Sequence, residues 1–168
     1  MKKRQILTFF LATLTLFACS NDDDSSSNEE NSIIGKWKLV NINDNGVIEQ
    51  ASECESKSII EFKSDNTFKD IAAIESENSN NCVYDGFGTS GTFELNGETL
   101  IRTTIDVIII PDELNNPNWI EDAKGENEPE KVSFENGLLS LTWIYEEQGN
   151  TFTEIYTYER TSSDFFSE

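Results

Sequence analysis

From Ile33 to Arg160 the chain reads as a series of strands, in which apolar and polar residues alternate with a two-residue period. Outside the first eighteen residues, no segment shows the 3.6-residue period of an amphipathic helix. Short stretches rich in Asn, Asp, Ser and Gly separate the runs and favour turns. This pattern predicts an all-β domain with eight strands, at residues 33–42, 58–62, 66–75, 90–97, 99–110, 130–137, 138–147 and 151–160.

Two of the turns carry the strongest short signal for a hairpin. Asn96-Gly97 and Asn136-Gly137 each stand between apolar runs, and both residue types accept the positive φ of a type I′ turn. Eight strands joined mostly by short hairpins predict an antiparallel up-and-down barrel, and an open β-sandwich is the competing fold. The stretch from Pro111 to Glu130 is long for a hairpin loop and matches no element.

The first eighteen residues indicate an export signal. Lys2, Lys3 and Arg4 precede an apolar stretch at residues 6–17. As a helix this stretch would rise about 18 Å, well short of the roughly 30 Å hydrocarbon core of a bilayer. We therefore interpret residues 1–18 as a signal peptide rather than a membrane-spanning or core helix. Residues 19–32 contain no apolar residue after Cys19 and predict a disordered acidic tether, followed by one domain at 33–160 and a tail at 161–168.

Residues 16–19, Leu-Phe-Ala-Cys, resemble the lipobox of bacterial lipoproteins. The resemblance implies cleavage before Cys19, lipidation of its thiol and acylation of the new N-terminus, because stable anchoring needs more than one chain. An ordinary secretory signal that leaves a free thiol is the alternative. Residues 20–24, Ser-Asn-Asp-Asp-Asp, resemble a signal in one group of Gram-negative bacteria for export to the outer face of the outer membrane. We therefore expect a lipid-anchored outer-membrane protein, with the acidic stretch read either as a cell-surface signal or as a solvated spacer.

The chain has three cysteines, Cys19, Cys54 and Cys82. Lipidation of Cys19 would leave an even pair in an oxidising compartment, where a disulfide between Cys54 and Cys82 is expected. Closing that loop would contribute about 3 kcal/mol to stability in the chain-entropy view. Two buried free thiols are the alternative.

Charge and composition limit the chemistry. Without residues 1–18 the chain carries 9 Lys and Arg and 32 Asp and Glu, a net charge of −23. Such a surface makes nucleic acid a poor partner. The absence of histidine excludes His-based triads and His–metal sites. The acidic stretch lacks the spacing of a calcium loop. We therefore expect no catalytic residues, no metal site and no cofactor.

Three ordered features resemble the lipocalin-like domains of short bacterial lipoproteins. Gly35-Lys36-Trp37 matches the G-x-W that opens the first strand, Cys54 precedes SIIEFKSDNTF, and Cys82 precedes GTFELNGETL. The resemblance implies a barrel and places Arg160 over the Trp37 indole at its closed end, a structural pair worth about 0.5–2 kcal/mol. The alternative is a solvated Arg160 at a strand end.

Aromatic residues are the candidates for ligand binding. Alternation puts Trp143 on one face with Leu139, Leu141 and Tyr145, and Tyr156 and Tyr158 on one face of the last strand. Trp119 lies in the long 111–130 segment and would act as a lid or a permanent plug.

We expect an anchored domain that binds a small apolar or amphipathic ligand. Two alternatives remain. In one, the aromatic side chains only fill the core. In the other, the protein is a structural accessory with a filled barrel that contacts another envelope protein.

Overall fold

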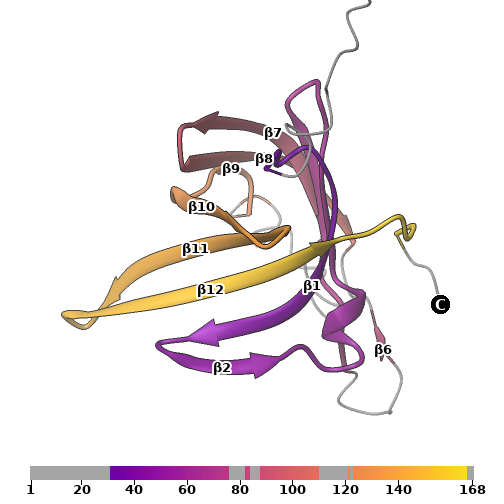
Figure 1. Ribbon diagram of the computed structural model, residues 1–168. Coiled ribbons are helices and arrows are strands. Elements are labelled where there is room, and N and C mark those ends of the chain that lie inside the picture. Colours follow the sequence, from indigo (N-terminus) through magenta and orange to yellow (C-terminus); the bar gives the residue numbers. More distant parts are fainter. Residues whose placement is uncertain (1–30, 76–81, 84–87, 110–120, 122, 166–168) are drawn as a thin grey trace, which may run out of the picture.

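The structure is a computed structural model that describes residues 31–75, 82–83, 88–109, 121 and 123–165. Its main sheet closes into an antiparallel ring of eight strands (Figure 1). This confirms the barrel and excludes the open sandwich. Around the ring the strands are β10 (Glu130–Glu135), β11 (Leu138–Glu147), β12 (Asn150–Arg160), β1 (Gly35–Asp44), β3 (Ile59–Phe62), β4 (Thr67–Ile71), β7 (Gly88–Asn96) and β8 (Thr99–Ile109), which pairs back with β10.

Each of the eight predicted strands is present, and the structure adds short elements that the sequence pattern missed. These are β2 (Val47–Gln50), η2 (Glu55–Lys57), β6 (Cys82–Val83) and β9 (Gly125–Glu126), while β5 (Ile74–Glu75) lies within a predicted strand. The predicted strand at 66–75 is divided into β4 and β5. All four residues of β2 are exposed, so this strand has no buried face whose alternation could reveal it.

The hairpin turns follow their Asn and Gly residues, with one correction. Asn136 and Gly137 have φ of 53° and 77° between the paired Glu135 and Leu138, as a type I′ turn requires. At the other predicted hairpin, Asn96 pairs with Thr99 and Gly97 alone has positive φ. The predicted type I′ turn at Asn96-Gly97 is therefore wrong by one residue, because the pairing makes Gly97 the first central residue, which is the pattern of a type II′ turn.

One half of the barrel is filled by a hydrophobic core. Its largest fully buried side chains are Trp37, Ile60, Phe62, Leu100 and Leu139. The Trp37 indole N–H donates to the Ile33 carbonyl oxygen at 2.7 Å, which satisfies its one polar group. The Phe62 and Phe93 rings meet edge to face with centroids 5.1 Å apart. This half is the closed end of the barrel.

The other half is bounded by a long wall of strands. β1 pairs with β3 through its first residues and with β2 through its last, while β12 runs beside it along its length. Figure 1 shows the β1–β2 and β11–β12 hairpins extending together from the body. A bulge between Leu39 and Asn41 shifts the register of β1, so that Ile42 pairs with Tyr156. The bulge therefore turns Ile42 and Asp44 toward the inside.

Arg160 fastens the closed end. It pairs with Trp37 in the β1–β12 ladder, and its guanidinium carbon lies 4.4 Å from the centroid of the Trp37 ring system. Its Nη1 and Nη2 donate to the carbonyl oxygens of Ile34 at 3.0 Å and Ser32 at 2.8 Å. Gly35 has φ of 137°, and a Cβ there would stand 2.6 Å from Arg160 Nη1. Glycine thus permits both the backbone conformation and the approach of the guanidinium.

We predict that Arg160→Lys lowers the free energy of unfolding by about 1–2 kcal/mol, because lysine keeps the charge but loses the fork of two hydrogen bonds and the flat contact with Trp37. Urea denaturation followed by tryptophan fluorescence measures it. Lys38→Ala is the control, since its ion pair with Glu159 is exposed and worth less than about 0.5 kcal/mol. Equal stability of Arg160→Lys and the parent protein would contradict the fastening role.

Candidate ligand-binding cavity

The open half of the barrel contains a cavity of about 460 Å³, within the range of small-molecule sites. Residues from both walls line it: Leu39, Ser58, Asp70, Ala72, Arg102, Asn127, Glu128, Glu130, Leu141, Trp143, Tyr156 and Tyr158. An adjoining hollow of about 390 Å³ lies against the β1–β2 hairpin and shares Tyr156 with the cavity. Its lining consists of Ile42, Asp44, Val47, Glu49, Gln50, Glu55, Glu154 and Tyr156.

The aromatic wall of the site comes from β11 and β12. The register of this pair sets Leu141 against Tyr156 and Tyr145 against Phe152, so all four side chains lie on the inner face. The Tyr145 ring stands 4.7 Å from Trp143 and 5.3 Å from Phe152, measured between centroids. Leu141 is buried in the core, whereas Trp143 is 36% exposed. The core thus ends at Leu141, and the aromatic residues beyond it form the rim.

The polar side of the cavity is built around Arg102. Its Nε and Nη2 donate to the two carboxylate oxygens of Glu130, at 3.0 and 2.7 Å, and its Nη1 donates to Asp70 at 2.9 Å. The Arg102 and Glu130 side chains are each 14% exposed and that of Asp70 is 30% exposed. Burial raises the pKa of the Asp70 carboxyl, and the nearby guanidinium opposes that shift. Two carboxylates therefore share one cation in a partly dry site.

A second polar feature is the carboxylate of Glu154. The Tyr145 hydroxyl donates to one of its oxygens at 3.1 Å, and the Tyr156 hydroxyl donates to the other at 2.7 Å. Burial and these hydrogen bonds raise the pKa of both tyrosines, so the phenols stay protonated donors. Burial and the charge of Asp70 likewise raise the pKa of Tyr158, whose hydroxyl has no hydrogen-bond partner within the described part of the chain. Tyr158 thus offers a free donor beside the cavity.

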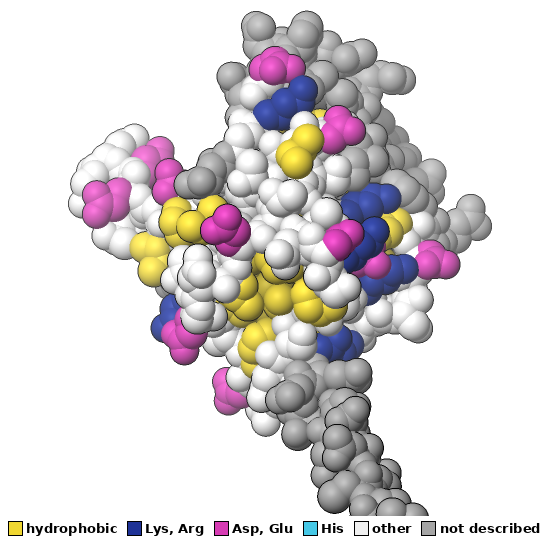
Figure 2. Space-filling view, turned by 90° about the horizontal axis from the view of Figure 1, so that it is seen from above, with side chains coloured by type: hydrophobic (Ala, Val, Ile, Leu, Met, Phe, Trp, Pro, Cys, Tyr) yellow, Lys and Arg dark blue, Asp and Glu magenta, His cyan; other side chains and the backbone are white. Residues whose placement is uncertain are grey.

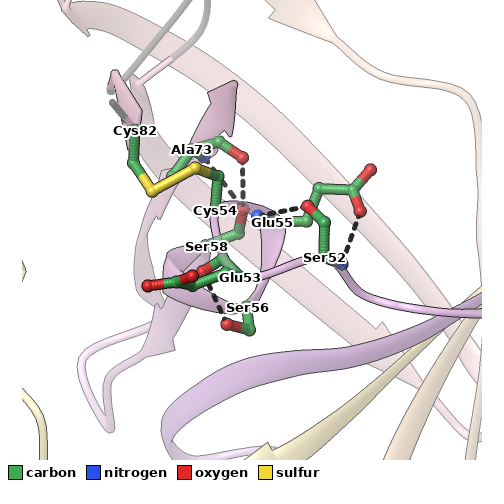
Figure 3. The surroundings of a disulfide bond; sticks show 8 residues. All are labelled: Ser52, Glu53, Cys54, Glu55, Ser56, Ser58, Ala73 and Cys82. Atoms are coloured by element: carbon green, nitrogen blue, oxygen red, sulfur yellow. Dashed lines mark hydrogen bonds between the residues drawn. A yellow bond between two sulfur atoms is a disulfide. The ribbon is translucent and has the colours of Figure 1, made fainter. Parts of the chain in front are cut away.

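A disulfide joins Cys54 to Cys82 beside this half of the barrel (Figure 3). Cys54 precedes η2, and Cys82 belongs to β6. Close by, the Ala73 backbone N–H donates to the Ser58 hydroxyl at 2.9 Å. Ser58 and Ala72, which both line the cavity, are therefore held by the same cluster of covalent and polar contacts.

Apolar side chains also lie on the outside of the molecule. In the view of Figure 2 hydrophobic side chains gather near the middle of the face, with acidic side chains scattered around them. Among the exposed large apolar residues, Ile48 of β2 and Ile144 of β11 are 69% and 57% exposed. The ladder relates them through Asn43, Ile155 and Thr153, so both point outward from the extended wall.

The predicted site residues divide into four groups. Cys54 and Cys82 form the disulfide beside the barrel. Trp143, Tyr156 and Tyr158 meet around the cavity. Trp37 and Arg160 lie together at the opposite, closed end. Cys19 and Trp119 lie outside the described residues.

Sequence reasoning missed Arg102 and its two carboxylates. The feature that could have revealed them is the position of Arg102 itself, a basic residue on the inward face of β8 between buried Leu100 and buried Thr104.

The described residues contain no group of three or more Cys, Asp or Glu side chains placed to hold a metal ion. They also contain no helix with the length and apolar character needed to cross a membrane.

Comparison with known proteins supports a lipocalin-like domain. Residues 33–115 match the family model of the lipocalin-like domain. No curated protein matches the chain. The matched range includes β1 to β8, while β10, β11 and β12, which complete the ring, lie beyond it.

We predict that Arg102→Met lowers the free energy of unfolding by about 3 kcal/mol at pH 7, because it leaves Glu130 and Asp70 ionised without a counter-charge. Urea denaturation at two pH values measures it. In the variant the folded state disfavours the ionised Asp70 carboxyl, so the pKa of this group rises and the folded state binds a proton there more tightly than the unfolded chain. The loss should therefore shrink at about pH 4.5.

The triple variant Arg102→Met, Glu130→Gln, Asp70→Asn is the control and should recover part of the loss at pH 7. A loss of the same size at both pH values would instead assign the effect to packing.

Proposed function

We propose that this protein is a lipid-anchored lipoprotein of the cell envelope whose lipocalin-like barrel binds one small apolar or amphipathic molecule. The observation that carries the proposal is the open cavity of about 460 Å³ lined by Leu39, Leu141, Trp143, Tyr156 and Tyr158. Ligand sites are typically apolar and aromatic with a few polar groups that fix orientation. The Tyr158 hydroxyl and the Arg102 cluster supply such groups.

The division of the barrel favours this function over that of a filled accessory. The core occupies the end around Trp37 and stops at Leu141, where the aromatic rim begins. An accessory that needs only its outer surface would not require a hollow lined by aligned aromatic residues. Ile48 and Ile144, exposed on the outer face of the extended wall, support contact with another envelope protein as a second function.

The anchor and its location are supported by the sequence alone. The basic start, the apolar stretch and Cys19 fit a lipoprotein signal, and the acidic residues after Cys19 fit export to the cell surface. We assign the protein to the outer membrane on this basis, with nucleic acid excluded as a partner by the charge of the chain.

Filling the cavity should abolish binding. We predict that Ala72→Phe weakens binding of the neutral apolar probe N-phenyl-1-naphthylamine by about tenfold or more, because the added ring occupies the cavity. Fluorescence titration measures the affinity. Thr92→Phe, on the exposed side of β7, adds the same group elsewhere and should leave it unchanged. Equal affinity in both variants, or no binding by the parent protein, would contradict a ligand site here.

The anchor has its own test in cells. We predict that Cys19→Ser abolishes labelling with radioactive palmitate and moves the protein out of the membrane fraction, because the thiol that carries the lipid is gone. The double variant Cys54→Ser, Cys82→Ser is the control and should keep both label and location. Protease treatment of intact cells should degrade the anchored domain, and its complete protection would contradict the surface assignment.

A further inference from the structure

The charges that line the site select a class of ligand, an inference that rests on the proposed function. Among the described residues, the hollow against the β1–β2 hairpin is bordered by four carboxylates, Asp44, Glu49, Glu55 and Glu154, and by no basic residue. None of the four forms an ion pair within the part of the chain that the structure describes. The concave walls around them also concentrate their field.

The main cavity carries a net negative charge as well. The part of its lining that the structure describes contains Asp70, Glu128 and Glu130 against the single cation Arg102. That guanidinium is already occupied, with two hydrogen bonds to Glu130 and one to Asp70. An anionic head group would therefore find no unpaired cation in the lining and would meet several carboxylates. A fatty acid or an organic phosphate suits this site poorly.

Glu154 provides a specific place for a cation. Each of its oxygens accepts one tyrosine hydroxyl, and a carboxylate can accept about four hydrogen bonds, so both oxygens keep acceptor capacity. Tyr156, which borders both the cavity and the hollow, sets an aromatic ring beside this carboxylate. A fixed carboxylate next to an aromatic ring is suited to an ammonium group.

We infer that the ligand is a cationic amphiphile. Its apolar chain or ring lies in the main cavity between Leu141 and Trp143, and a single amine or quaternary ammonium group lies in the hollow against Glu154 and Tyr156. The two compartments meet at Tyr156, so one molecule spans both.

The experiment compares three probes with the same twelve-carbon chain: dodecyltrimethylammonium, dodecyl maltoside and dodecyl sulfate, each below its micelle concentration. A soluble form that begins at Ser20 retains every described residue and the whole core, which closes within residues 33–160. Titration calorimetry should show the cation binding at least about tenfold more tightly than the anion, with the neutral probe between them. The advantage of the cation should fall as salt is raised.

Matched variants locate the effect. Glu154→Gln should weaken binding of the cation by about fivefold to tenfold and change the neutral probe by less than about twofold. Glu49→Gln, which alters an exposed carboxylate of the same hollow, should act in the same direction. Glu94→Gln removes an equal charge from the outside of β7 and should have no effect, and thermal melts check that each variant is folded.

The outcomes distinguish a failure of the ligand-binding function from a failure of the cationic ligand class. Absence of binding by all three probes would overturn the ligand-binding function itself. Binding of the anion as tight as that of the cation, or an equal effect of Glu154→Gln on the cationic and neutral probes, would overturn the cationic class and leave the cavity as a ligand site.

Discussion

The barrel depends on the short seam where β10 meets β8. Only two residue pairs join these strands, Glu130 with Leu100 and Lys131 with Thr99. One further backbone hydrogen bond, from Val132 N–H to the Glu98 carbonyl oxygen at 2.7 Å, extends the seam. All other neighbouring strands of the ring have four or more residue pairs. The sheet would open here first, because closure removes its last two edges through the fewest backbone contacts.

Arg102 contributes to both the seam and the cavity. Arg102 lies on β8 and donates two hydrogen bonds to Glu130 of β10 at the seam. Its backbone carbonyl oxygen also accepts a hydrogen bond from Asn127 N–H at 2.8 Å, which holds the segment that returns to β10. An apolar residue could fill the space but could not join two strands through so few pairs. The same contact between Arg102 and Glu130 thus forms the polar side of the cavity and joins the two strands that close its wall.

Much of this architecture could be predicted from sequence, because local residue patterns determine the positions of the strands and the turns. Two-residue alternation located the eight ring strands, and it placed Leu141, Tyr156 and Tyr158 on inner faces before any contact was known. The turn at Gly97 was misplaced because Asn-Gly allows two registers that only strand pairing distinguishes. β2 was missed because an exposed strand has no hydrophobic period.

The polar parts of the site were the harder ones to foresee. The Arg102 cluster joins residues from β4, β8 and β10 that are far apart in sequence, so no local pattern predicts it. No local pattern predicts the bulge between Leu39 and Asn41 either. It turns Ile42 and Asp44 inward, whereas strict alternation from Leu39 would point them outward. Distant pairing, rather than residue type, decides both features.

The attachment of the N-terminal segment orients the site. Arg160 binds the carbonyl oxygens of Ser32 and Ile34 at the end of the barrel that Trp37 closes, whereas the cavity begins past Leu39 on the same strand. The chain that leads back to Cys19 therefore leaves from the closed end. In the proposed lipid-anchored form, the open end would face away from the membrane, so the proposed amphiphile would enter the cavity from the aqueous phase.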